Sequence, residues 1–540
     1  MAARLPRLSA TAGYRLVVML AVGVLALAGC VRGTSVAQGS ELIRGPLRYL
    51  LASSTDLGPS RSADAQATVT LSDSTRPAGL IEWADSRGLS VRWRSGDQWA
   101  VVEGPARTLA RAFDVPVHDY RGPKGQMYYA SSHQAQAPEA LRDKVTEVGR
   151  ILSYTPHRTN SPGFLPLDVP QKGLTPTALL EAYNAAPLSA SGFTGKGTTI
   201  VFFEFSGFDQ EDLDTFSETS RLPRFTPVMV GDQFPGSGAE TVMDLEVAHA
   251  IAPDAQKVVV NARPTVEGDG GYEKIGQLFE KVDRQFPGAV WSLSIGWGCD
   301  ALVRAADLAP VASALEAAQK NGTSAFDASG DTAGLECKGG DEWSSPPGPD
   351  DIGLDAVSSL PAMTAVGGTT LSTDERGQWI AEHAWIDSPL SQGSSGGVSG
   401  LYGRPQWQNR LTVERDLEHR RLSPDVAAVA DPFTGVRIIY NQQELIGAGT
   451  SQAAPIWAAL TVLMNQYLVA NGGRQLGNIN PLLYRVASGA NLPGFRDVIL
   501  GGNAVDFSAP GYDLVTGLGS PNVDYLVRDL LDIQRGRAPR

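Results

Sequence analysis

The sequence predicts an α/β protein in which a parallel sheet carries helices on both faces, preceded by a smaller α+β domain. From residue 198 onward, short runs of β-branched and aromatic residues alternate with longer helical stretches, which is the pattern of repeated strand–helix units. The strand-like runs are almost continuously apolar, as expected of strands buried on both faces. A proline-rich connector at 156–176 separates this region from an earlier segment with a different pattern.

The earlier segment, residues 41–157, is predicted to be a compact α+β domain. Its predicted strands are 69–73, 89–104 (with a turn at 95–97) and 127–132. Its predicted helices are 105–113, where apolar residues share one side, and 138–152, which Pro138 would open.

The region after the connector is predicted to supply the parallel sheet and its covering helices. Its predicted strands are 198–205, 257–262, 289–296 and 323–329. The stretch 174–184 begins this domain, and its predicted helices are 244–252, 274–286 and 306–322. Parallel neighbours need helical crossovers, so this alternation favours one sheet covered on both sides.

Composition excludes two broad classes. The 540 residues are 42% apolar and 19% charged, so enough apolar surface is present for packed cores and disorder is not the main state. The net charge of −13 offers no general basic face, so no nucleic-acid partner is predicted. The length predicts more than one domain.

The N-terminus carries the pattern of a lipoprotein signal. Three arginines precede an apolar run at 16–28, which is too short for a spanning helix but suits a signal peptide. The run ends in Leu-Ala-Gly-Cys30, which resembles the bacterial lipobox. We therefore expect a signal peptide at 1–29, lipid on Cys30, a tether at 30–40, and anchoring to the outer face of the bacterial cell membrane. An ordinary signal peptide with a chance cysteine is the alternative.

The other two cysteines, Cys299 and Cys337, form an even pair in an oxidising compartment. Each follows a predicted strand, and neighbouring parallel strands would bring both loops to one sheet edge. The sequence therefore predicts a Cys299–Cys337 disulfide, with two free thiols as the alternative.

Ser451 is the candidate nucleophile. A glycine-rich turn at 447–449 places Thr450 and Ser451 at the start of a long apolar helix, where the helix dipole favours developing negative charge. An ordinary N-cap serine has the same setting. The six histidines offer no clear base, because none lies in the His-Gly-Thr setting that subtilisins use and His249 is predicted to be a packed helix residue.

Carboxylates are the alternative bases. Glu240 and Asp244 are four residues apart, so a helix would place them on one face, where each raises the pKa of the other. Asp331 follows a predicted strand in a glycine-rich turn, and a protonated carboxyl there could donate to an oxyanion. Taken singly, the Glu240–Asp244 spacing is better explained by an acidic helix start, and Asp331 equally well by an ordinary turn aspartate.

In chain order, Glu240-x-x-x-Asp244, Ser-Gly-Asp331 and Gly-Thr-Ser451 resemble the motifs of the sedolisin, or serine-carboxyl peptidase, family. The resemblance implies a subtilisin-like fold in which glutamate replaces histidine as the base. It assigns Ser451 as nucleophile, Glu240 as general base, Asp244 as the acid that orients Glu240, and Asp331 as the oxyanion-hole residue. Residues 104–130 resemble the kumamolisin-type activation domain of the family.

The stretch 495–522 resembles the family's calcium site. The resemblance implies one calcium ion, held by oxygen ligands in a loop. It assigns as ligands the carboxylates of Asp497 and Asp513 and the backbone carbonyls of Val498, Ala509 and Gly511.

The resemblance implies a secreted, membrane-anchored serine endopeptidase that is active at acidic pH and is made as a self-processing zymogen. The activation prodomain would be 41–157, the processing linker 158–174 and the peptidase domain 175–540. The expected partners are protein or peptide substrates, the chain's own prodomain as intramolecular inhibitor, and the membrane. Release from the membrane after processing is the alternative location.

Two other classes of protein remain. One is a catalytically inactive, anchored binding lipoprotein that keeps the peptidase fold. The other is a histidine-dependent subtilisin-like hydrolase, for which the histidine motif is missing. A carboxylate base favours acidic conditions and a histidine base favours neutral ones, so a pH profile separates the two enzymes.

Overall fold

The computed structural model describes residues 41–539, except for 160–164, 167–172, 339–347, 388–391, 414, 417 and 490–493. At 158, 159, 165 and 166 it describes the backbone alone. The predicted signal peptide, Cys30 and the tether lie outside the described residues, as do parts of the processing linker. Residues Ser40–Arg540 form one structural unit, within which we call residues 41–157 the N-terminal domain and 175–540 the C-terminal domain.

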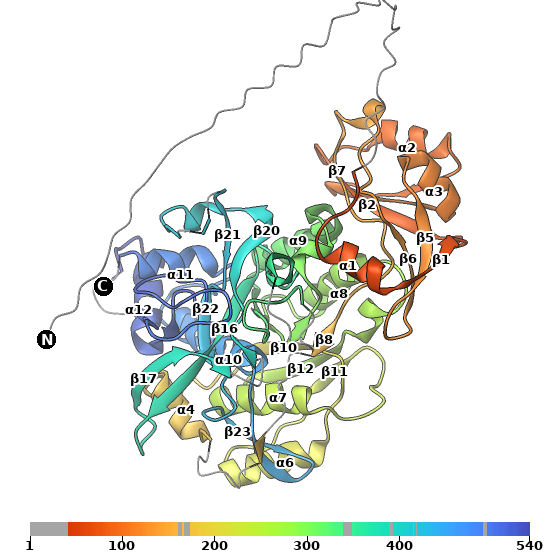
Figure 1. Ribbon diagram of the computed structural model, residues 1–540. Coiled ribbons are helices and arrows are strands. Elements are labelled where there is room, and N and C mark those ends of the chain that lie inside the picture. Colours follow the sequence, from red (N-terminus) through yellow and green to blue (C-terminus); the bar gives the residue numbers. More distant parts are fainter. Residues whose placement is uncertain are drawn as a thin grey trace, which may run out of the picture. The chain divides into compact units, whose positions relative to one another are not determined.

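The C-terminal domain is built on the parallel sheet that the sequence predicts (Figure 1). The strand order is β11-β12-β10-β13-β15-β16-β17, and β22 also pairs with β16. All these pairings are parallel except that of β17, which returns antiparallel beside β16. The strands are β10 (Thr199–Glu204), β11 (Val228–Val230), β12 (Gln256–Asn261), β13 (Val290–Leu293), β15 (Ser324–Ala328), β16 (Thr364–Thr373), β17 (Trp379–Ala384) and β22 (Val426–Val429).

Helices cover both faces of this sheet, and each face has its own apolar core. Ile200 and Phe202 of β10 join the core under α7, α10 and α12, whereas Val201 and Phe203 join the core under α8 and α9. This alternation is the period of two that a strand imposes. The helices are α4 (Pro176–Ala182), α5 (Ala186–Ala190), α6 (Gln210–Ser220), α7 (Ala239–Ile251), α8 (Gly271–Gln285), α9 (Ala305–Lys320), α10 (Thr450–Ala470), α11 (Asn480–Ala487) and α12 (Val523–Gln534).

Short strands form the connections and the periphery of the domain. They are β14 (Ile295–Gly296), β18 (Ile386–Asp387), β19 (Gln392–Gly393), β20 (Gly397–Gly403), β21 (Arg420–Ser423), β23 (Arg437–Tyr440), β24 (Gln443–Ile446), β25 (Phe495–Arg496) and β26 (Ser520–Pro521). Two of them, β14 and β24, lie beside the candidate site described below. Of these, β14 continues the chain beyond β13, and β24 leads into the turn before α10.

The N-terminal domain packs two helices, α2 and α3, on an antiparallel sheet of order β3-β4-β2-β7. A second sheet has the order β1-β5-β6. The elements are α1 (Pro46–Ser53), β1 (Thr55–Pro59), β2 (Ala65–Leu71), α2 (Ala78–Asp85), β3 (Ser90–Arg92), β4 (Trp99–Gly104), α3 (Ala106–Phe113), β5 (Val117–Arg121), β6 (Met127–Ser131) and β7 (Val145–Val148).

The predicted helix at 138–152 is wrong. The chain makes one 3-10 turn at Glu139–Leu141 and then forms β7, which pairs antiparallel with β2. The residues Glu139–Lys144 have good helix propensity, but Val145, Val148 and Ile151 are all buried in the domain core. Pairing with β2 and burial of these side chains outweigh a local preference worth a few tenths of a kcal/mol per residue.

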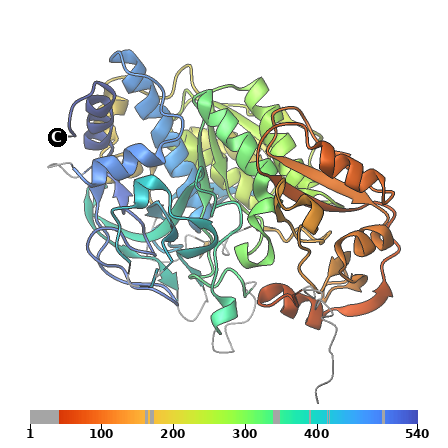
Figure 2. The same cartoon turned by 90° about the horizontal axis from the view of Figure 1, so that it is seen from above.

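The N-terminal domain lies against α8 and α9 (Figure 2). Arg92 donates from both terminal nitrogens to Glu273 on α8, and Arg94 does the same to Glu280. In the opposite direction, Glu147 of β7 accepts from the Arg304 side chain and from the backbone N–H of Ala306, in the first turn of α9. Each side of the interface therefore supplies both an arginine and a carboxylate to these ion pairs.

Two short strands of the processing linker pair with the C-terminal domain, although a stretch this rich in proline does not predict regular structure. β8 (Arg158–Thr159) pairs antiparallel with β14. β9 (Leu165–Pro166) pairs antiparallel with β24. Before them, Pro156 packs against Gly298, whose φ of 87° and lack of a Cβ permit that approach.

Among the described residues, one helix is long and apolar enough to cross a bilayer. It is α10, and most of it is buried inside the C-terminal domain, as expected of a core helix.

Candidate active site

Ser451 lies in the first turn of α10 and is fully buried. The N-cap is Gly449, with a φ of 87°, so the capping interpretation of Ser451 does not apply. The Ser451 hydroxyl donates a long hydrogen bond of 3.5 Å to the carbonyl oxygen of Ser294, which directly follows β13. A helix N-terminus supplies backbone N–H groups and positive potential around this oxygen.

Asp244, on α7, also lies close to Ser294. The Ser294 hydroxyl lies 2.6 Å from Asp244 Oδ2 and 3.1 Å from the carbonyl oxygen of Ser451, so it can donate to either. Asp244 is fully buried, and burial together with the nearby Glu204 raises the pKa of Asp244 well above its usual value. Asp244 is therefore protonated over a wide pH range, or shares a proton with its neighbour.

Glu204 is the site residue that sequence reasoning missed. It ends β10, is buried, and makes a carboxyl–carboxyl hydrogen bond with Asp244. Thr241 also donates to Glu204, at 3.0 Å. Burial and the nearby Glu240 raise the pKa of Glu204 to about 8. The available signal was a glutamate that ends an otherwise apolar strand.

Glu240 lies one turn before Asp244 on α7, as the predicted helical spacing requires. It is 5% exposed and close enough to Glu204 to raise the pKa of that carboxyl. Because α7 packs against α10, the three acids Glu204, Glu240 and Asp244 lie next to the helix that carries Ser451.

Asp331 approaches the same helix from the other side. It follows β15 and accepts hydrogen bonds on Oδ1 from the Thr450 backbone N–H, at 2.8 Å, and from the Thr450 hydroxyl, at 2.7 Å. The Thr450 hydroxyl in turn accepts from the Gly330 N–H at 3.1 Å. The Asp331 carboxyl is thus fixed to the residue before Ser451.

Comparison with known proteins gives these contacts a context. Residues 65–154 match the model of the pro-kumamolisin activation domain. Kumamolisin from Bacillus sp. (strain MN-32) is 28% identical over 488 residues, which cover 84% of this chain and 83% of that protein. Sedolisin from Pseudomonas sp. (strain 101) is 27% identical, over 78% of this chain and 73% of the relative. Mouse tripeptidyl-peptidase 1 is 27% identical, over 76% and 74%.

A solved structure agrees with these relatives. Pseudomonas sedolisin, a serine-carboxyl proteinase complexed with two molecules of pseudo-iodotyrostatin, superposes with a TM-score of 0.56 at 25% identity, covering 67% of this chain and 98% of that one. The chain belongs to the sedolisin family. It is a serine-carboxyl peptidase made as a zymogen, with a kumamolisin-type activation domain before a sedolisin-like fold.

The strand β14 lies beside the candidate site. It follows Ser294 directly, and its backbone pairs with β8 of the processing linker. The next residue, Trp297, is buried. Its backbone N–H donates to Asp355 at 2.7 Å, and its backbone carbonyl accepts from the Tyr272 hydroxyl at 2.9 Å. A strand held this rigidly can add an extended peptide by backbone pairing.

The predicted calcium ligands lie together in one loop. The Asp497 carboxylate accepts from the Gly511 N–H at 2.8 Å, and Asp513 accepts from the Ala509 N–H at 3.3 Å. Both carboxylates therefore converge on the backbone of 509–511, while Val498 follows Asp497 directly. Two carboxylates among backbone carbonyls form a hard oxygen donor set that fits calcium.

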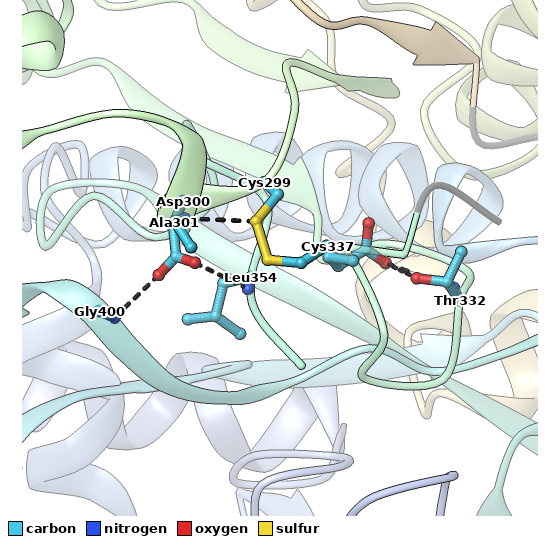
Figure 3. Close-up of a disulfide and its surroundings, with 8 residues drawn as sticks. Cys299, Asp300, Ala301, Thr332, Cys337, Leu354 and Gly400 are labelled. Atoms are coloured by element: carbon cyan, nitrogen blue, oxygen red, sulfur yellow. Dashed lines mark hydrogen bonds between the residues drawn. A yellow bond between two sulfur atoms is a disulfide. The ribbon is translucent and has the colours of Figure 1, made fainter. Parts of the chain in front are cut away.

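The predicted disulfide is confirmed. Cys299 and Cys337 are bonded, with Cα atoms 4.9 Å apart (Figure 3). Asp300, next to the bridge, accepts from the Gly400 N–H at 2.9 Å and the Leu354 N–H at 3.3 Å. The bridge therefore joins the loop after β14 to the loop that carries Asp331, at the edge where neighbouring β13 and β15 end.

His249 is a packed helix residue, as predicted. It is fully buried, contacts the Pro223 carbonyl and Lys257, and stacks on Phe225. Burial and the charge of Lys257 lower the pKa of His249 to about 3. Both ring nitrogens of His249 are engaged by Pro223 and Lys257, so we assign His249 no part in the chemistry at Ser451.

Proposed function

We propose that this protein is a secreted, membrane-anchored serine endopeptidase that works at acidic pH, with Ser451 as nucleophile, Glu240 as general base, Asp244 as its orienting acid and Asp331 in the oxyanion hole. The observation that carries the proposal is the convergence of three chain segments on the start of α10. Ser294 lies between Asp244 and Ser451, and Asp331 is fixed to Thr450.

Acyl transfer at a peptide bond follows from these placements. Glu240 takes the Ser451 proton as the hydroxyl oxygen attacks the scissile carbonyl. The Ser451 backbone N–H and the protonated Asp331 carboxyl donate to the oxygen that becomes negative. Glu240 then gives its proton to the leaving amine, and water hydrolyses the acyl-enzyme by the same route. Asp244, protonated and held by Ser294, positions and polarises Glu240.

Acidic pH is the expected working range because the buried carboxyls must keep their protons. The raised pKa values of Glu204 and Asp244 allow this pair to stay protonated while Glu240 accepts a proton. The proposed oxyanion role needs a protonated Asp331 carboxyl, so activity should fall once that carboxyl loses its proton.

The N-terminal domain is the proposed intramolecular inhibitor. Its ion pairs hold it on α8 and α9, and the linker backbone already occupies the edge of β14 next to Ser294. A protein substrate must use the same edge, so inhibition lasts until the linker is cut within 158–174. The enzyme itself makes that cut as the pH falls.

Calcium and the membrane anchor complete the proposal. Asp497, Asp513 and the carbonyls of Val498, Ala509 and Gly511 would hold one calcium ion, which would stabilise the loop rather than take part in the chemistry. Lipid on Cys30 would keep the zymogen at the outer face of the bacterial cell membrane.

The test is self-processing on acidification. The chain from Val31 to Arg540 is brought from pH 7 to about pH 4 beside Ser451→Ala, and chain length is followed on a gel. Cleavage within 158–174 followed by digestion of an unfolded protein, in the wild type alone, supports the proposal. If both chains stay whole across the pH range and cut no substrate, the proposal fails and an inactive binding lipoprotein becomes the better description.

A further inference from the structure

Glu336 is a buried carboxylate that the mechanism above does not use. It is 6% exposed and lies five residues after Asp331. Its Oε1 accepts from the Thr332 hydroxyl at 2.6 Å, from the Thr332 N–H at 3.3 Å and from the Ser395 hydroxyl at 2.5 Å. Ser395 also accepts from the Gly334 N–H at 3.1 Å, so a network of hydrogen bonds spans the turn from 332 to 334.

We propose that Glu336 is a positioning residue for the peptidase reaction: its carboxylate holds the turn that carries Asp331 and thereby sets where the Asp331 carboxyl meets the reacting carbonyl. The proposal rests on the oxyanion role assigned to Asp331 above. Thr332 is the residue directly after Asp331, so Glu336 fixes the backbone on one side of Asp331 while Thr450 fixes its carboxyl.

The turn needs such a support because its backbone is strained. Gly330 has a φ of 114°, which glycine adopts without penalty, whereas Ala333 has a φ of 55°, in the left-handed region that costs an ordinary residue roughly 1–2 kcal/mol. A Cβ at Gly330 would overlap the Glu336 carboxylate, so the acid lies directly against the backbone of this turn. A strained backbone conformation of this kind is retained only where the surrounding contacts hold it in place.

Glu336 is itself held in place by its neighbours. Cys337, the next residue, is bonded to Cys299, and the Cys337 N–H donates to the Asp351 carbonyl. On the other side, Leu335 bridges to Gly353. Figure 3 shows Thr332 beside this disulfide, with its hydroxyl in a hydrogen bond. The disulfide therefore supports the acid that supports the Asp331 turn.

The experiment compares Glu336→Ala, Glu336→Gln, Asp331→Ala and the double variant Asp331→Ala/Glu336→Ala in the full chain. The readouts are the first-order rate of linker self-cleavage, kcat on a quenched peptide at acidic pH, and the thermal midpoint. Glu382→Ala is the matched control, because Glu382 is equally buried and accepts from Thr369, Trp379 and Ser520 on the outer strand β17.

We expect Asp331→Ala to lower the rate by about 100- to 1,000-fold, the usual cost of one oxyanion donor. Glu336→Ala should cost about 10- to 100-fold, because misplacing a reacting group by about 1 Å is enough for that loss. Glu336→Gln should stay within about threefold of wild type, since an amide oxygen accepts the same hydrogen bonds. Glu382→Ala should lower the thermal midpoint similarly but leave the rate below melting within about twofold.

The double variant separates positioning from general stability. If Glu336 acts through Asp331, Glu336→Ala should add less than about twofold in the Asp331→Ala background. Losses that multiply, or a Glu336→Ala chain as fast as wild type, overturn the inference while the proposed function stands. A fully active Asp331→Ala chain overturns the oxyanion role itself, and the inference with it.

Discussion

The ion pair between Arg92 and Glu273 predicts how firmly the prodomain is held. Both terminal nitrogens of Arg92 donate to Glu273, whose side chain is 10% exposed, and this contact raises the pKa of Arg92. In Arg92→Ala, the Glu273 carboxylate stays in the interface but loses both arginine donors. Among the described contacts, the Gln277 amide is then its remaining side-chain donor. A hydrogen bond to a charged group contributes about 1.5–3 kcal/mol, and the 42% exposure of Arg92 reduces this to about 1.5–2.5 kcal/mol.

That loss corresponds to about 10- to 70-fold more of the opened zymogen at a fixed pH. If opening precedes the cut, the self-cleavage rate rises by the same factor. The assay times linker cleavage on a gel at a pH where the wild type is cut slowly, with Ser451→Ala as the zero rate. Arg224→Ala is the control, because Arg224 also contacts two carboxylates but within the C-terminal domain. An Arg92→Ala chain that is cut no faster than wild type would refute the reasoning.

The same interface predicts the direction of the pH effect. Hydrogen bonds from Arg94 lower the pKa of Glu280, so this pair stabilises the closed zymogen above the free pKa of the carboxyl and is lost as the pH falls through its lowered value. Asp307, in the first turn of α9, accepts from the Arg150 N–H of the N-terminal domain. It opposes this trend, because burial raises its pKa to about 6 and protonation relieves that cost. Acid opening therefore depends on the arginine–glutamate pairs. In Arg94→Ala, the self-cleavage midpoint should shift toward neutral pH, and an unchanged midpoint would contradict this assignment.

Three further predictions concern the peptidase domain. The first uses the Ser451→Ala background. The raised pKa of Glu204 stabilises the fold below the unfolded pKa of about 4.5, and this stability is lost as the pH rises toward about 8. Glu204→Gln should therefore flatten the fall of the thermal midpoint over that pH range. Asp244→Asn should lower kcat by about 100-fold or more while the midpoint changes little, and an equal loss of both would indicate a structural role. A calcium chelator should lower the thermal midpoint by several degrees, and Asp513→Asn should abolish that response; a chelator effect that survives the substitution would place the ion elsewhere.

Much of the fold could be predicted from local pattern alone. The runs around Ile200, Val259, Trp291 and Phe326 are strands of the parallel sheet, because continuous burial on both faces imposes continuous apolar sequence. The helical spacing of Glu240 and Asp244 was equally readable. The stretch 138–152 was misread, because pairing with β2 overrides the helix propensity of its first half.

The candidate site, too, could be predicted from the sequence only in part. The order of motifs identified Ser451, Glu240, Asp244 and Asp331 as candidates, since each motif is a short stretch of sequence. The sequence did not predict that Glu204 shares a hydrogen bond with Asp244, because the two residues come from different elements and meet only when β10 and α7 pack together.

The sequence by itself determined four strands of the parallel sheet and the helices between them, the candidate nucleophile and acids, and the two cysteines that could pair. These depend on composition and spacing within short segments. Only the tertiary structure decided which carboxyls keep their protons, how Glu336 supports the Asp331 turn, and which arginines hold the prodomain. Each of these depends on burial and on contacts between residues far apart in the chain, and neither quantity is fixed until the domains pack.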